Sequence, residues 1–227
     1  MIGLLMKQTP PTRIHNQTIL DCIEGTKYDK VIEVGCMYGA LAAKYIEKNP
    51  SVNWIGIDID QEYVEVAKMH CSSAFCLDVE KLSELEFKYL ENAQLWIFAD
   101  VLEHLYNPWK LLERIRKSSS EVEIIACIPN SQHWSFQARI NSGDMNYESH
   151  GLFDKTHIRF FSQKTMTELF ENEGYKVINL IPRIFDFPGQ DKYDNCIFEF
   201  AKLTGVDPSL AVQRSKVFQY VYHVKKS

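Results

Sequence analysis

Four apolar runs of the chain each end in residues that could hold a small polar ligand. The first run ends in Glu33-Val34-Gly35-Cys36-Met37-Tyr38-Gly39 and opens into a helical pattern at Ala40. Glycines at a strand-to-helix junction let backbone N–H groups approach a ligand, and the N-terminus of the helix adds a partial positive charge. This junction therefore predicts a binding turn.

Acidic residues follow the next two runs, and an acid together with a histidine follows the fourth. The second run ends in Gly56-Ile57-Asp58-Ile59-Asp60, where an acid can accept hydrogen bonds from ribose hydroxyls. The third ends in Cys76-Leu77-Asp78-Val79, where an acid beside a backbone N–H could bind the amino edge of adenine. The fourth ends in Asp100-Val101-Leu102-Glu103-His104-Leu105. Together the four ends outline one crevice above an open α/β sheet.

The elements that must position these residues are short apolar strands alternating with amphipathic helices. This alternation predicts βαβ units and a parallel sheet, and the near-continuous apolar strands predict helices on both of its faces. The expected strands are 30–34, 52–57, 74–77, 93–99 and 121–128, and the expected helices are 13–24, 40–48, 62–69 and 105–117.

The second half of the chain breaks this rhythm. Residues 131–161 are rich in aromatic residues, His, Asn and Gly, with weak periodicity, and are expected to form a loop region that caps the substrate. A helix is expected at 165–173, with Ser162 as its N-cap and Gly174 as its C-cap. Helices at 195–203 and 208–214 and strands at 177–181 and 217–224 complete the pattern. The whole chain, 1–227, is therefore predicted to be one α/β domain with a mostly parallel seven-stranded sheet, an antiparallel C-terminal strand and a loose tail at 1–12.

Composition excludes several classes of protein. The 227 residues include 25 Lys plus Arg against 30 Asp plus Glu, for a net charge of −5 and a pI near 5.8, so a general nucleic-acid binder is not expected. No apolar run approaches the roughly 18 residues of a membrane span, so no membrane insertion is expected. The six cysteines stand at irregular spacings and are interpreted as reduced thiols of a cytoplasmic protein.

The four strand-end motifs, in this order and spacing, resemble the class I S-adenosylmethionine-dependent methyltransferases over about residues 15–181. The resemblance implies a Rossmann-like fold and S-adenosylmethionine as the cofactor. It implies that Glu33 and Gly35 border the methionine part of the cofactor, that Asp58 binds its ribose and that Asp78 binds its adenine amine. It also implies that the cofactor is bordered by Cys36, Gly39, Ile59, Val79 and Asp100.

One position departs from the family's usual E-x-G-x-G-x-G pattern. Met37 stands where that pattern has its second glycine, and a side chain there could narrow the methionine end of the pocket. A Rossmann dehydrogenase, which binds a nicotinamide cofactor, is the nearest structural alternative, but it prefers G-x-G-x-x-G, and here the glycines are Gly35 and Gly39 only. Met37 also keeps open a non-catalytic cofactor-binding protein that serves as a scaffold beside a glycan assembly complex.

A second block of motifs indicates the acceptor. Residues 129–134 (PNSQHW) and 151–161 (GLFDKTHIRFF) look like the P-N-x-x-H-W and G-L-x-D-x-T-H-x-R-F-F segments of a methyltransferase subgroup associated with bacterial capsule, O-antigen and other surface glycans. The implied substrate is a sugar hydroxyl, on a nucleotide sugar or a glycan, with Asn130, Trp134 and Arg159 as substrate-binding residues. Another small molecule or a lipid precursor is the alternative acceptor in the same class.

Methyl transfer to a hydroxyl also removes a proton, which an imidazole can accept. His157, His133 and His104 all lie on segments expected to border the crevice. His157 is the first choice for the general base, because the polar stretch around it leads straight back to the body of the fold. Arg159 could bind a substrate carboxylate or phosphate through two parallel hydrogen bonds.

Each candidate also has a structural explanation. Asp78 could cap a helix, and Asp100 could order the end of its strand. His104, His157 and Arg159 could make structural hydrogen bonds or ion pairs, and His133 with Trp134 could pack a lid. No tight ligand spacing such as H-x-x-x-H is present, so no metal site is expected. The aromatic strand at 217–224 could form an edge that pairs in a homodimer.

Overall fold

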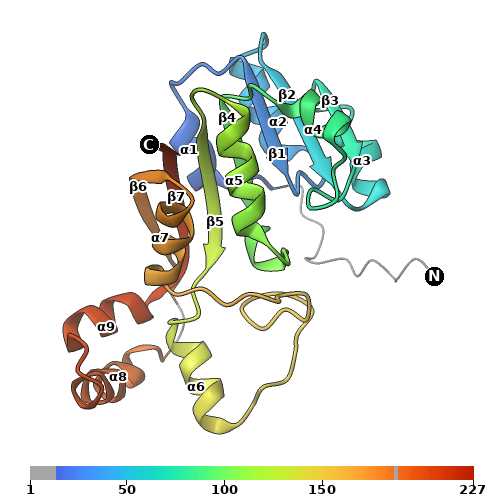
Figure 1. The fold of residues 1–227 in the computed structure, drawn as a ribbon. Coiled ribbons are helices and arrows are strands. Elements are labelled where there is room, and N and C mark those ends of the chain that lie inside the picture. The colour runs from blue at the N-terminus through green and yellow to red at the C-terminus, as the bar shows by residue number, and fades with distance from the viewer. Residues whose placement is uncertain (1–13, 187–188) are drawn as a thin grey trace.

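The computed structural model describes residues 14–186 and 189–227, so the expected tail at 1–12 lies outside the described residues. Its centre is a seven-stranded sheet in the order β3-β2-β1-β4-β5-β7-β6 (Figure 1). The strand order reverses between β1 and β4, and in open α/β sheets such a switch point opens a crevice at the carboxyl ends of the strands. The predicted fold class is confirmed.

The first five strands are parallel, and the last two are antiparallel to them. In chain order the parallel strands are β1 (Lys30–Val34), β2 (Asn53–Asp58), β3 (Ser73–Cys76), β4 (Leu95–Ala99) and β5 (Glu123–Pro129). The antiparallel strands are β6 (Tyr175–Ile184) and β7 (Val217–Lys226). All seven lie within a few residues of their predicted ranges.

Helices cover both faces of the sheet, as the apolar strands predict. One face carries α1 (Gln17–Ile23), α2 (Ala40–Lys48) and α3 (Gln61–Ala67). The other carries α4 (Glu84–Leu90), α5 (Pro108–Ser118) and α7 (Gln163–Asn172). Successive strand residues alternate between the two faces, so that Val31 packs in the first layer and Ile32 in the second.

Three expectations need correction. Helix α4 was not predicted, although Ser83 and Glu86 form a capping box at its start. Strand β7 is not an edge: it lies between β5 and β6, and its Tyr220 and Tyr222 are buried in the core, so the edges of the sheet are β6 and β3. The region 131–161 is not all loop, because it contains helix α6 (Trp134–Ser142).

The segment between β5 and α7 leaves the sheet and returns to the same place. Asn130 and Phe161 form an isolated parallel bridge, and the N–H of Ser131 donates to the carbonyl of Phe161 at 2.9 Å. Helices α6, α8 (Asp191–Leu203) and α9 (Pro208–Ser215) lie together beyond the carboxyl end of β5 (Figure 1). Within the described residues, no helix is long and apolar enough to cross a membrane.

Candidate functional site

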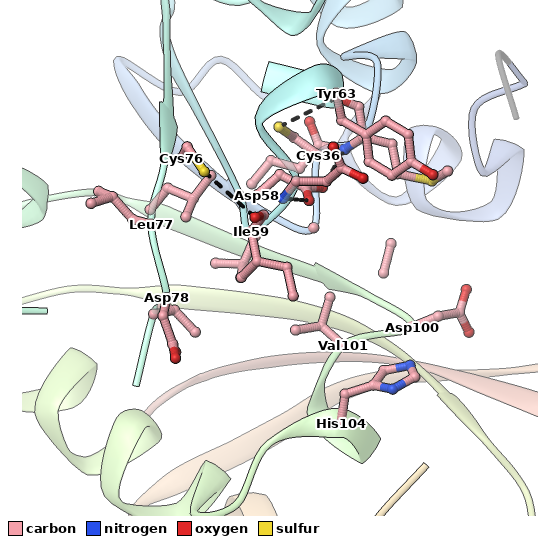
Figure 2. Close-up of a pocket in the computed structure, with 18 of the residues that line it drawn as sticks. Cys36, Asp58, Ile59, Tyr63, Cys76, Leu77, Asp78, Asp100, Val101 and His104 are labelled. Carbon is pink, nitrogen blue, oxygen red and sulfur yellow. Dashed lines mark hydrogen bonds between the residues drawn. The ribbon is translucent and has the colours of Figure 1, made fainter. Parts of the chain in front are cut away.

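A cavity of about 940 Å³ opens at the carboxyl ends of β1–β4. Figure 2 shows Asp58, Asp78 and Asp100 reaching it from three different strand ends, with His104 below them. Among the residues predicted to bind cofactor, those that line the cavity are Glu33, Gly35, Cys36, Asp58, Ile59, Asp78, Val79 and Asp100. The fold thus brings the four strand-end motifs together around one space.

The turn after β1 is closed by the carboxylate that follows β2. The N–H of Met37 donates to Asp58 Oδ2 at 2.9 Å, and the N–H of Asp60 donates to Asp58 Oδ1 at 3.0 Å. Gly35 has φ +73°, and a Cβ at this position would stand 2.6 Å from Val101 Cγ2. This position therefore needs glycine both for its left-handed backbone and for the space it leaves.

Gly39 has a different role from the one predicted. It does not line the cavity, and its φ of +74° starts α2. A Cβ there would lie 3.1 Å from His70 Cβ and 3.3 Å from the backbone of Ala67, so this glycine lets α2 begin close to the end of α3. Met37 does line the cavity, and it adopts φ +46°, a left-handed backbone that glycine would take without strain.

Two carboxyl groups of the cavity lining, the buried Glu33 and the partly buried Asp100, have raised pKa values. Burial raises the pKa of Glu33 to about 8, although its Oε2 accepts a hydrogen bond from Trp54 Nε1 at 2.9 Å. Burial also raises the pKa of Asp100 to about 6, and the charge of Arg183 opposes that rise. Asp100 accepts a hydrogen bond from Gln219 Nε2, which ties the end of β4 to β7.

The charge of the cavity favours a cationic ligand. Six of the described lining residues carry a carboxyl group, and Lys81, the one lysine among the described lining residues, pairs with Asp78 at 2.5 Å. Asp78 also accepts the N–H of Glu80 at 3.0 Å, but it does not cap a helix, because a turn follows it and the N-cap of α4 is Ser83. A pyrophosphate would meet repulsion here, whereas a sulfonium or an ammonium group would be attracted. The carboxylates therefore argue against the nicotinamide alternative. The lining residues are Ile14, His15, Asn16, Glu33, Val34, Gly35, Cys36, Met37, Tyr38, Ala40, Leu41, Ile57, Asp58, Ile59, Asp60, Tyr63, Cys76, Leu77, Asp78, Val79, Glu80, Lys81, Ala99, Asp100, Val101, His104, Leu105 and Tyr106.

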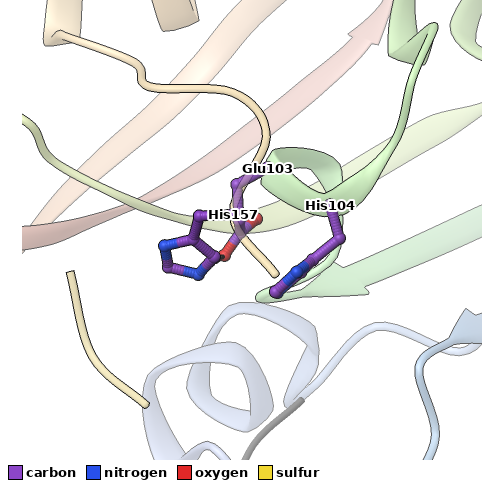
Figure 3. A group of neighbouring side chains, drawn as sticks. All are labelled: Glu103, His104 and His157. Atoms are coloured by element: carbon purple, nitrogen blue, oxygen red, sulfur yellow. Dashed lines mark ion pairs between the residues drawn. The ribbon is translucent and has the colours of Figure 1, made fainter. Parts of the chain in front are cut away.

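Glu103, His104 and His157 form a compact group beside the cavity (Figure 3). Glu103 and His104 belong to the short 3₁₀ helix η1 (Leu102–His104), and His157 comes from the segment that returns to the sheet. The two imidazole rings are 4.7 Å apart, centre to centre, and His157 Nε2 lies 3.8 Å from Glu103 Oε1. Of the two rings, only that of His104 lines the large cavity.

Hydrogen bonds fix the tautomers of both rings. His104 Nδ1 lies 3.1 Å from both the carbonyl and the hydroxyl oxygen of Thr156. That hydroxyl donates to the buried carboxylate of Asp154 at 2.6 Å, so His104 Nδ1 must donate and Nε2 carries a lone pair. His157 Nδ1 faces the carbonyl of Leu152 at 3.3 Å, which assigns its proton in the same way.

Burial lowers the pKa of both imidazoles and raises that of the Glu103 carboxyl group. It lowers the pKa of His104 to about 4, with a smaller effect from the neighbouring His157, and it lowers the pKa of His157 as well. It raises the pKa of Glu103 well above the ordinary value, and the nearby charge of Asp100 adds to that rise. Two neutral imidazoles with free Nε2 lone pairs can accept a proton or bind a metal ion.

The other predicted acceptor-side residues lie outside the large cavity. Asn130 is fully buried, and its amide donates to the carbonyls of Arg214 and Val217. His133 caps α6 and contacts Ser135 Oγ at 2.7 Å, and burial lowers its pKa to about 4. Trp134 stacks on Tyr193 of α8 with ring centres 4.7 Å apart.

Arg159 fastens the returning segment to η1 and to the start of α5. Its guanidinium donates to the carbonyl of Tyr106 and lies 5.5 Å from the centre of the Trp109 ring. The N–H groups of Ile158 and Arg159 both donate to the carbonyl of Glu103 at 3.0 Å. This clamp holds His157 beside η1.

Sequence reasoning missed several lining residues. Tyr38 and Tyr63 meet edge to face at 5.0 Å on the wall of the cavity, and residues 14–16 line it just before α1. An aromatic residue inside the glycine turn is a signal that could have identified Tyr38. Glu103 had no predicted role beyond its place in the fourth strand-end motif, because nothing in the sequence shows that His157 folds back against it.

Comparison with known proteins agrees with this geometry. Residues 12–180, well over half of the chain, match a family model described as a methyltransferase domain. A search of curated proteins finds no match to the sequence.

Solved structures share the fold at low sequence identity. Magnesium protoporphyrin IX methyltransferase from Synechocystis PCC 6803, with bound SAH, has a TM-score of 0.60 at 11% identity, over 93% of this chain and 81% of that one. A SAM-dependent methyltransferase from Archaeoglobus fulgidus has a TM-score of 0.59 at 13% identity, over 95% of each chain. The O-methyltransferase of a trans-AT PKS multienzyme of Brevibacillus brevis, in complex with S-adenosyl-L-homocysteine, has a TM-score of 0.59 at 15% identity, over 93% of this chain and 71% of that one.

Proposed function

Because the chain belongs to the methyltransferase domain family and is an S-adenosylmethionine-dependent methyltransferase, we propose that it methylates a sugar hydroxyl. The sugar would be carried on a nucleotide or a growing glycan of a bacterial surface polysaccharide. The observation that supports methyl transfer at this site is the cavity over β1–β4, which is lined by carboxyl groups, with His104 on its wall and His157 beside His104.

Different residues of the cavity would bind different parts of the cofactor. Glu33 and the Gly35 turn would border its methionine part, where the positive charge of the bound ammonium or sulfonium would lower the raised pKa of Glu33 and favour its ionised form. Asp58, which keeps lone pairs beyond its two backbone hydrogen bonds, would accept from the ribose hydroxyls. Asp78 and Val79 would border the adenine.

Methyl transfer requires mainly that the acceptor oxygen be positioned relative to the methyl group. S-adenosylmethionine supplies a methyl group on a positively charged sulfur, and an acceptor oxygen displaces that sulfur in line. Most of the acceleration can then come from holding the oxygen in the line of attack. The acceptor must also lose its proton, and we place that loss at the Glu103–His104–His157 group, whose imidazoles are neutral and whose Nε2 atoms carry lone pairs.

The sugar acceptor is supported by the sequence. The segments at 129–134 and 151–161 look like those of methyltransferases associated with surface glycans. In the fold the second of these segments carries Thr156 and His157 back against η1, beside His104 on the wall of the cavity, and this supports a role in binding the acceptor. A polar acceptor bearing several hydroxyls suits a site whose nearest groups are imidazoles.

Calorimetric titration tests the cofactor first. We expect S-adenosylmethionine and its demethylated product to bind with micromolar affinity and NAD not to bind. Asp58→Ala should weaken binding by about 1–3 kcal/mol, because it removes the ribose partner and leaves the Met37 N–H unpaired. Binding of NAD in place of the sulfonium compound would contradict the proposal.

The acceptor is then tested by mass spectrometry. The protein is incubated with S-adenosylmethionine and a panel of nucleotide sugars, and a mass gain of one methylene on a sugar supports the proposal. Phenols, carboxylic acids and lipid precursors serve as competing acceptors. Methylation of one of these, with no sugar modified, would refute the sugar assignment and leave the methyltransferase chemistry intact.

A further inference from the structure

We propose that Glu103, His104 and His157 bind a divalent transition-metal cation at the acceptor side of the cavity. The inference deepens the proposed function, because it specifies how the acceptor hydroxyl loses its proton. One ligand atom from each of the three residues lies within 4.8 Å of the other two. Figure 3 shows Glu103 and His157 side by side, with His104 next to them on η1.

Glu103 is the first reason to place a cation here. The residue is 1% exposed, and within the described part of the chain neither of its carboxyl oxygens has a hydrogen-bond partner. A buried polar group without a partner is expensive, and buried carboxylates are normally paired or bound to a metal. The carboxyl group is directed toward His157, whose Nε2 lies 3.8 Å from Oε1.

The two imidazoles are prepared as metal ligands. A metal-binding histidine normally donates its other N–H to a carbonyl or a carboxylate, which fixes the tautomer and the ring orientation. His104 donates through Nδ1 to Thr156, and Thr156 is held in turn by the buried Asp154. His157 Nδ1 faces the carbonyl of Leu152 at 3.3 Å. Both rings are therefore held from behind, with Nε2 left to bind a cation.

The spacing requires only a small closure. Ligands bound at about 2.1 Å from one ion stand at most about 4 Å apart. The separation of Glu103 Oε1 and His157 Nε2, 3.8 Å, already lies within that range. The widest separation in the group needs side-chain rotations that draw the atoms inward by less than about 1 Å.

The donor set indicates the class of metal and its role. Two imidazoles with one carboxylate suit Zn²⁺, Fe²⁺, Mn²⁺ or Co²⁺ better than Mg²⁺, which prefers oxygen ligands and keeps its waters. Three protein ligands leave positions for water or substrate, as in catalytic rather than structural zinc sites. Because the His104 ring lines the cavity, an open position can face the acceptor.

A cation there lowers the pKa of a hydroxyl bound to it, as it does for water. The hydroxyl proton then passes to solvent, and the oxygen forms its bond to the methyl carbon as the carbon–sulfur bond breaks. The electron pair of that bond remains on sulfur, which becomes a neutral thioether. Atoms and charges balance without any further reactant.

Direct metal binding tests the proposal. The full chain is stripped with a chelator, dialysed, and titrated with Zn²⁺ by calorimetry and with Co²⁺ by visible absorption. We expect one equivalent to bind, with the intense visible bands of low-coordinate Co²⁺ that carries nitrogen ligands. Glu103→Gln should weaken Zn²⁺ binding by more than about 100-fold, because it removes the anionic ligand at nearly constant shape.

Two more variants distinguish this site from adventitious binding. His150→Ala removes an exposed histidine outside the group and should leave Zn²⁺ affinity unchanged. Asp154→Asn alters the support behind His104 and should weaken Zn²⁺ binding by roughly 10–100-fold. Thermal unfolding of the metal-free Glu103→Gln protein should match that of the wild type, which shows that the variant folds.

Three outcomes decide the matter. Equal Zn²⁺ affinity of the wild type and the folded Glu103→Gln variant overturns the metal site. Methyl transfer at an undiminished rate in excess chelator also overturns it, and it leaves the proposed function standing, with a histidine as the base. Failure of the demethylated cofactor to bind overturns the proposed function, whatever the Zn²⁺ titration shows.

Discussion

The proposed cofactor side and the proposed acceptor side of the cavity are built in different ways. The cofactor side consists of loops that directly follow β1–β4, so each motif reaches the cavity because its own strand ends there. The acceptor side joins η1 to the segment around His157, two pieces that are distant in the sequence and are held by hydrogen bonds to the Glu103 carbonyl. The first side is a local consequence of strand order, and the second depends on a tertiary clamp.

The two sides also differ in how tightly they are packed. At Gly35 a Cβ would stand 2.6 Å from Val101. At Gly143 and Gly151, in the segment beyond β5, a Cβ would meet no described atom within 4 Å apart from those of its own stretch of chain. The cofactor side should therefore tolerate little change, whereas the distant part of the acceptor segment should tolerate much.

The largest effect is expected at the acceptor side. His157→Ala should lower turnover by roughly 10²–10⁴-fold, because it removes one member of the group that takes the acceptor proton. The affinity for S-adenosylhomocysteine, measured by calorimetry, should stay unchanged. His133→Ala serves as the control, since His133 caps α6, and it should mainly lower stability by about 1 kcal/mol. A His157→Ala protein with full turnover would transfer the role to His104 or to water.

A smaller effect is expected on the cofactor side. Gly35→Ala should destabilise the fold by about 2–4 kcal/mol, through left-handed backbone strain and the clash with Val101. It should also weaken S-adenosylhomocysteine binding at least about tenfold. Gly143→Ala is a matched control with the same φ of +73° and open space around it, so it should show only the strain, about 1–2 kcal/mol. If Gly35→Ala and Gly143→Ala lowered stability and affinity by equal amounts, the contrast in packing would be refuted.

The free energy of unfolding should depend on pH through the buried carboxyl group of Glu33. Burial raises the pKa of Glu33 to about 8, above the ordinary value of 4.5, so the folded state holds a proton that the unfolded state has lost. The contribution of this group is therefore full below pH 4.5 and is lost as the pH rises to 8. Glu33→Gln should remove that loss, on the order of 3–4 kcal/mol between pH 5 and 8. Urea unfolding at pH 5 and pH 8 measures this loss of stability. A Glu33→Gln variant whose stability depends on pH as the wild type's does would contradict the prediction.

The smallest effect is expected at Met37. Met37→Gly relieves its left-handed backbone but loosens the unfolded chain, so stability should change by less than about 1 kcal/mol. If the side chain narrows the cavity, calorimetry should show S-adenosylhomocysteine binding severalfold tighter. Asn92→Gly, with φ +59° at an exposed position away from the cavity, controls for the backbone effect and should leave affinity unchanged. An equal gain in affinity for both variants would show that Met37 does not restrict the site.

Most of the cofactor side could be predicted from the sequence. Strand β1 and helix α2 have the bounds that were expected, and eight of the nine residues predicted to bind cofactor line the cavity. This succeeded because hydrophobic periodicity sets the strands, and parallel strands bring their carboxyl ends to one edge of the sheet. Gly39 was the exception, because a glycine motif does not show which of its glycines faces the ligand and which faces a neighbouring helix.

The acceptor side was decided by the tertiary structure. Asn130, His133 and Trp134 belong to a promising motif, yet the fold uses them to hold α6 and the C-terminal strands. Glu103 carried no clear signal, yet the fold buries it against His157. The sequence by itself determined which polar residues follow each strand and that they meet at one edge of the sheet. Both depend on local periodicity and on the parallel arrangement of the strands. Only the tertiary structure decided which distant side chains meet, because that depends on how a long connection is fastened back to the sheet.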